Sequence, residues 1–77
     1  MSKTFTDENL LVWEAYPTGG DFGLSASPYI VFNCLTNRML RPRVVQQGGD
    51  EADAERVVAT ASQRDLLELF HQSREIR

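Results

Sequence analysis

Hydrophobic positions follow two different periods along this chain. In three short runs, residues 10–16, 29–36 and 40–46, apolar, β-branched and aromatic side chains cluster in the way that is typical of β-strands. From residue 51 onward the apolar positions recur every three or four residues, as on one side of an α-helix. The order of these patterns predicts an α+β fold: a three-stranded antiparallel meander followed by two C-terminal helices that pack on one face of the sheet.

The second predicted strand is apolar on both of its faces. Because successive side chains of a strand point to opposite sides, Ile30, Phe32 and Cys34 share one face, and Tyr29 and Val31 lie on the other. A strand that is apolar on both faces is normally covered twice. The two helices supply one cover, so we expect the other face to meet a partner and the protein to be a homodimer.

The helical region carries two start signals. Asp50 occupies an N-cap position with Asp53 three residues later, and Ser62 is followed in the same way by Asp65. These signals favour two helices with a break near residues 60–62. A single helix from residue 51 to about residue 73 stays open as an alternative, because no residue there forbids continuation.

The remaining segments define the domain organisation. Residues 1–9 are polar and lack periodicity, so they are interpreted as a flexible N-terminal arm, and residues 10–77 as a single α+β domain. Three glycines between two prolines make residues 17–28 a long loop. Pro42 cannot donate a ladder hydrogen bond, which places the third strand at an edge of the sheet or interrupts it.

The size of the chain supports self-association. A chain of 77 residues forms one domain and buries only about 60% of its unfolded surface. Domains of this size usually need a disulfide, a metal or a partner subunit. The single cysteine, Cys34, excludes an intrachain disulfide, so oligomerisation remains.

Hydropathy indicates the compartment. The N-terminal residues lack the apolar core of a secretory signal, and no apolar stretch approaches the roughly 18 to 20 residues that span a bilayer. We therefore expect a cytoplasmic protein without membrane association.

Charge is unevenly distributed along the chain. The net charge is −3, yet residues 38–47 contain three arginines, Arg38, Arg41 and Arg43, and no acid. Arginine suits phosphate and carboxylate groups, so this cluster is a candidate site for an anionic ligand, a nucleic-acid backbone or an acidic partner. Protection of an edge strand explains the same residues without a ligand. The acidic net charge disfavours a general nucleic-acid binder.

Candidate partner-binding residues lie in or beside the long loop. Aromatic and apolar side chains near a glycine-rich loop are typical of recognition surfaces. The candidates are Trp13, Phe22, Leu24 and Tyr29.

No motif indicates catalysis. Cys34 and His71 are the only residues of their kinds, and a small Cys–His enzyme would need both. Their apolar neighbours favour structural roles, and no ligand spacing indicates a metal site or a cofactor. The sequence therefore predicts no catalytic residues, no metal and no cofactor. We expect a small non-catalytic interaction or regulatory module, with anion or nucleic-acid binding through the arginines and a Cys–His enzyme as the alternatives.

Overall fold

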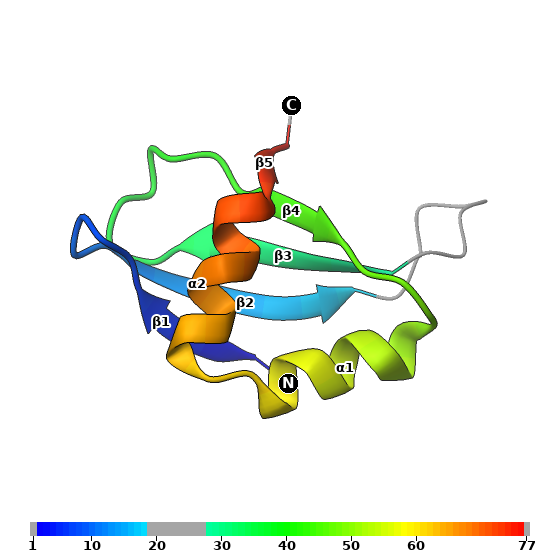
Figure 1. The fold of residues 1–77 in the computed structure, drawn as a ribbon. Helices are drawn as coiled ribbons and strands as arrows, with labels where there is room; N and C mark the ends of the chain where they lie inside the picture. The colour runs from blue at the N-terminus through cyan, green and yellow to red at the C-terminus, as the bar shows by residue number, and fades with distance from the viewer. Residues whose placement is uncertain (1, 19–27, 77) are drawn as a thin grey trace.

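The computed structural model of the chain describes residues 2–18 and 28–76. They form a five-stranded antiparallel sheet in the order β1-β2-β3-β4-β5, with two helices on one face (Figure 1). The strands are β1 (Lys3–Thr6), β2 (Val12–Thr18), β3 (Tyr29–Cys34), β4 (Arg43–Gln46) and β5 (Arg74–Glu75). The helices are α1 (Glu51–Thr60) and α2 (Gln63–Gln72).

The predicted fold class is confirmed, but the predicted number of strands is wrong. The sheet has five strands instead of three. Strand β1 lies in the segment expected to be an arm, where Phe5 is buried against the core. Strand β5 has only two residues and follows α2, so β4 is not an edge strand. Pro42 instead interrupts the predicted third strand, because β4 begins at Arg43. Strands β1 and β5 are too short to show a period of two in the sequence.

Strand register brings the core side chains onto one face of the sheet. Phe5 lies opposite Trp13, which lies opposite Cys34 on the next strand. Two residues further along the same strands, Ala15 lies opposite Phe32. These alternate positions face the helices and are buried, and for β3 they are the ones that the period of two placed on one face. Val58 of α1 and Leu66 of α2 complete the core from the helix side, in the cluster that the sheet residues form.

The ring of Phe70 joins α2 to the sheet. Its centroid lies 5.6 Å from the ring of Phe5, 4.6 Å from that of Trp13 and 5.6 Å from that of Phe32. These rings come from β1, β2 and β3. Aromatic pairs at such distances contribute about 0.5–1.5 kcal/mol each beyond the burial of their area. Phe70 therefore fixes α2 across three strands.

The two helices begin at capping boxes, which confirms two helices instead of one. The Asp50 carboxylate accepts from the N–H of Asp53, whose own carboxylate accepts from the N–H of Asp50. Ser62 and Asp65 make the same reciprocal pair. Between the helices, Ala61 is extended and ends α1. Aspartate at the third helical position therefore serves in place of the usual glutamate or glutamine.

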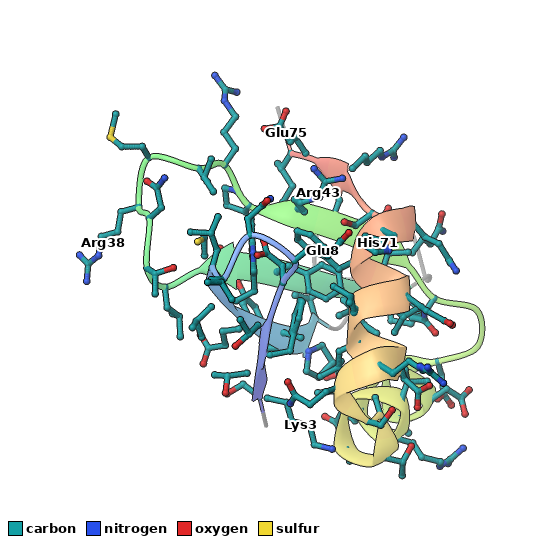
Figure 2. All side chains as sticks on the ribbon, turned by 60° about the vertical axis from the view of Figure 1, so that its left-hand side comes forward. Lys3, Glu8, Arg38, Arg43, His71 and Glu75 are labelled. Atoms are coloured by element: carbon teal, nitrogen blue, oxygen red, sulfur yellow. The ribbon has the colours of Figure 1, made fainter. Side chains whose placement is uncertain are left out.

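Side chains from β1 and α2 tie the sheet edge to the helices. Lys3 Nζ donates hydrogen bonds of 2.8 and 2.9 Å to the carbonyl oxygens of Ala59 and Ala61 (Figure 2). A cation there complements the C-terminal end of α1, whose last turn has no basic residue of its own. Gln63 Nε2 donates to the carbonyl oxygen of Thr4, 2.8 Å away. These contacts explain why the N-terminal segment forms a strand.

Asp7 organises the turn between β1 and β2. Its Oδ1 accepts hydrogen bonds from the N–H groups of Asn9 and Leu11, and its Oδ2 accepts from Trp13 Nε1 at 2.8 Å. In the same turn Leu10 has a φ of 65°, a left-handed conformation that costs a residue other than glycine about 1–2 kcal/mol. The Asp7 carboxylate compensates for this strain within the turn.

The environment of Asp7 makes folding dependent on pH. Burial raises the pKa of Asp7, but the hydrogen bonds from Trp13, Leu11 and Asn9 outweigh it, so the pKa lies below its usual value of 3.8. A carboxyl group whose folded pKa is lowered stabilises the fold above the unfolded pKa. That contribution is lost as the pH falls through the folded pKa.

We expect Asp7→Asn to lower the free energy of unfolding at neutral pH by about 1–3 kcal/mol, the usual loss for hydrogen bonds to a charged group. Urea unfolding followed by the fluorescence of Trp13 measures this difference. The difference should shrink as the pH falls below about 4. Glu55→Gln, which changes an exposed acid of α1, is the control and should have little effect. A difference that stays constant down to pH about 2 would contradict the role of the Asp7 charge.

Candidate functional site

The face of the sheet opposite the helices is the candidate site. Both helices lie on one side of the sheet, and no other described helix or strand covers the second side (Figure 1). We call this second side the open face. It contains a broad hollow of about 880 Å³. The hollow is lined by Tyr16, Thr18, Tyr29, Val31, Asn33, Pro42, Val44, Arg74, Glu75 and Ile76.

The centre of the open face is apolar. Tyr16 of β2, Val31 of β3 and Val44 of β4 are register partners and form one row across the sheet. Val31 is only 8% exposed, while Tyr16 and Val44 are half-buried. Asn33 Nδ2 donates a hydrogen bond to Tyr16 Oη at 3.2 Å, which satisfies a polar group and orients the tyrosine ring. The arrangement suits contact with an apolar surface.

Opposite charges lie on opposite sides of this apolar centre. Arg74 of β5 is the register partner of Val44, and its side chain is exposed. Glu14 of β2 projects to the open face two residues before Tyr16 and accepts a 2.9 Å hydrogen bond from Ser2 Oγ. Within residues 2–18 and 28–76, neither Glu14 nor Arg74 forms a salt bridge. The open face is therefore bounded by Glu14 on β2 and by Arg74 on β5. Glu75 also borders the hollow, but it is the register partner of Arg43, which points to the helix side.

The structure does not bring the three candidate arginines together. Arg43 points to the helix side, where its Nε and Nη2 donate to Ser73 Oγ and to the Ser73 carbonyl oxygen at 2.9 and 2.6 Å. Its guanidinium also lies 5.2 Å from the centroid of the Phe70 ring. Arg38 projects from the loop before β4, away from Arg43, and Arg41 is exposed (Figure 2). Arg43 is therefore engaged within the fold, while Arg38 and Arg41 are exposed.

The four candidate partner-binding residues do not share one surface in the described part of the structure. Trp13 is 3% exposed, because it occupies the helix side of β2 and packs in the core. Tyr29 lines the hollow of the open face. Phe22 and Leu24 lie outside the described residues.

Cys34 and His71 do not meet. Cys34 is buried, and its Sγ lies 3.7 Å from Thr36 Oγ1. His71 Nε2 lies instead 2.5 Å from Glu8 Oε1, so α2 is joined to the β1–β2 turn (Figure 2). In the described part of the chain, no three His, Cys, Asp or Glu side chains gather as metal ligands.

A second exposed apolar surface lies at one end of the sheet, where the β1–β2 turn and the β3–β4 loop both lie (Figure 1). Met39 is 90% exposed and Leu10 is 81% exposed. Leu35 and Leu40 are exposed in the same loop as Met39. This loop end is separate from the hollow, although Pro42 lines the hollow where the loop reaches β4.

Sequence reasoning missed half of the open face. The period of two placed Tyr29 and Val31 on it, but Val44, Arg74 and Ile76 were not recognised as site residues. Ile76 is held beside β4 by a 2.9 Å hydrogen bond from its N–H to the carbonyl oxygen of Pro42. Two residues of strand after a helix have no signal that a single sequence can show.

Comparisons of the chain with protein-family models, with curated proteins and with solved structures find no match. Neither described helix has the length and the apolar character needed to cross a membrane.

The contacts of Arg43 predict a structural role for this residue. We expect Arg43→Gln to lower the free energy of unfolding by about 1–3 kcal/mol, because the variant loses charged hydrogen bonds to Ser73 and the contact with Phe70. Arg41→Gln is the matched control and should change it by less than about 0.5 kcal/mol, as for other exposed positions. Urea unfolding of both variants measures the difference. Equal effects would contradict the assigned role of Arg43.

Proposed function

We propose that this chain is a small non-catalytic interaction module that works as a homodimer, with the open face as the interface between two copies. One observation carries the proposal: a five-stranded sheet has its helices on one face and an apolar hollow on the other. An apolar patch that no described helix or strand covers is typical of a protein interface.

The composition of the open face supports an interface. Interface centres are enriched in tyrosine and depleted of charge, and the two tyrosines of the chain, Tyr16 and Tyr29, both lie on this face. The longer dimensions of the molecule, 34 and 28 Å, bound a face large enough for the roughly 800 Å² that each partner of a standard interface buries.

The need for additional stabilisation supports the same proposal. Cys34 is a free thiol, and no metal-ligand group gathers among residues 2–18 and 28–76. A second copy supplies the apolar burial that a domain of 77 residues lacks. A free thiol also fits a reducing compartment, and we propose the cytoplasm.

The alternatives have less support. A Cys–His enzyme needs Cys34 and His71 side by side. In the structure Cys34 instead contacts Thr36, and His71 contacts Glu8. Anion binding through all three arginines has less support, because the guanidinium of Arg43 already donates hydrogen bonds to Ser73.

We expect sedimentation equilibrium in the micromolar range to give twice the monomer mass of 8.7 kDa. Val44→Asp places a charge in the centre of the open face, so we expect it to raise the dimer dissociation constant at least 100-fold. Tyr29→Lys changes a residue at another position of the hollow and should also raise the dissociation constant. It serves as the test variant if Val44→Asp does not fold. Circular dichroism establishes that each variant is folded.

Leu10→Asp is the matched control, because Leu10 is apolar and exposed but belongs to the β1–β2 turn and lies outside the hollow. This variant should remain dimeric. A wild-type protein that stays monomeric at high micromolar concentration contradicts the proposal. So does a dimer that Leu10→Asp dissociates and Val44→Asp does not.

A further inference from the structure

We infer that the two copies stack about a two-fold axis that runs parallel to the strands, between β3 and β4, and that Glu14 of each copy pairs with Arg74 of the other. This inference rests on the proposed function, since it describes the orientation of the same dimer. It follows from the positions of the charges on the open face.

The register fixes where these charges lie. Tyr16, Val31, Val44 and Arg74 occupy one row that crosses the sheet from β2 to β5. Glu14 lies in the next row on the same face, opposite Asn33. Neighbouring strands are about 4.8 Å apart, and same-face residues along a strand are roughly 7 Å apart. The acid and the base are therefore on opposite sides of the hollow and one row apart.

Two stacked sheets lie about 10 Å apart with their strands roughly aligned. A two-fold axis can then run parallel to the strands or across them. An axis across the strands places each strand over the equivalent strand of the second copy, so that β5 lies over β5 and β2 over β2. The two Arg74 side chains then share one side of the dimer and the two Glu14 side chains share the other. Like charges placed together in an interface oppose association.

An axis parallel to the strands, between β3 and β4, exchanges the two sides of the sheet. Strand β5 of one copy then lies over β2 of the other, and β3 lies over β4. Arg74 comes above Tyr16 of the second copy, one row from Glu14. A gap of roughly 10 Å between sheets and 7 Å along the strand is within reach of the two extended side chains. The symmetry makes this ion pair twice.

The same axis determines where the loops lie. It passes between β3 and β4, and so toward the loop that joins these two strands. It also preserves the direction of the strands, so both copies present this loop at the same end of the dimer. Met39 of one copy then lies near Met39 of the other. An axis across the strands places the two loops at opposite ends.

A charge exchange tests the ion pair. We expect Glu14→Arg alone and Arg74→Glu alone each to raise the dimer dissociation constant about tenfold, because each variant places like charges together. The double variant, Glu14→Arg with Arg74→Glu, should return the constant to within about threefold of wild type. Sedimentation equilibrium at low and moderate salt measures all four proteins. The dissociation constant of the wild type should rise with salt, because screening weakens the pair.

Cross-linking at position 39 tests the orientation independently. Met39→Cys in a Cys34→Ala background carries one exposed thiol, and a short bismaleimide should join the two copies of the dimer. Arg56→Cys in the same background, on the exposed side of α1, is the control and should not cross-link.

The outcomes separate this inference from the proposed function. A wild-type monomer at high micromolar concentration contradicts both. A dimer in which the double variant is no tighter than the single variants, and in which position 39 fails to cross-link, contradicts the orientation but leaves the interface proposal standing. Rescue by the double variant together with a cross-link at position 39 supports both.

Discussion

The contact of Phe70 with the sheet is the interaction on which this architecture depends. Its ring meets aromatic rings from β1, β2 and β3, and Arg43 of β4 stacks on it while donating to Ser73. One side chain of α2 therefore holds four strands together on one face. The hydrogen bonds that end α2 at Ser73 also position the chain for β5. Loss of this contact would release both the helix and the last strand.

Both described helices cover one face of the sheet, and no helix formed by residues 2–18 or 28–76 covers the other. The helices have ten residues each, and both are used on the Phe70 side. The open face consequently keeps Tyr16, Tyr29 and Val44 half-buried at the surface, with opposite charges at its two sides. Contact of this apolar area with water is unfavourable in free energy. In the dimer that we propose, association of two copies removes that area from water, and the position of the charges selects one orientation.

The sequence predicted those parts of the fold that have a local signal. Alternation in residues 29–34 assigned both faces of β3, and the N-cap residues Asp50 and Ser62 located both helix starts. It failed where structure depends on distant contacts. Lys3–Thr6 is a strand because Lys3 and Thr4 bond to the helix region more than 50 residues away. Arg43 resembles an exposed cation in the sequence, yet Ser73 and Phe70 engage it. Val44, Arg74 and Ile76 join the open face for the same reason, through strand pairing between segments that are distant in the sequence.

Fluorine NMR of protein labelled with 3-fluorotyrosine tests the central claim most directly, because the two tyrosines of the chain both lie on the open face. The account predicts that the resonances of Tyr16 and Tyr29 both change as the concentration rises through the dimer dissociation constant, while the fluorescence of the buried Trp13 does not. Tyrosine resonances that stay unchanged across a transition from monomer to dimer mass would show that the copies associate elsewhere, and would contradict the account.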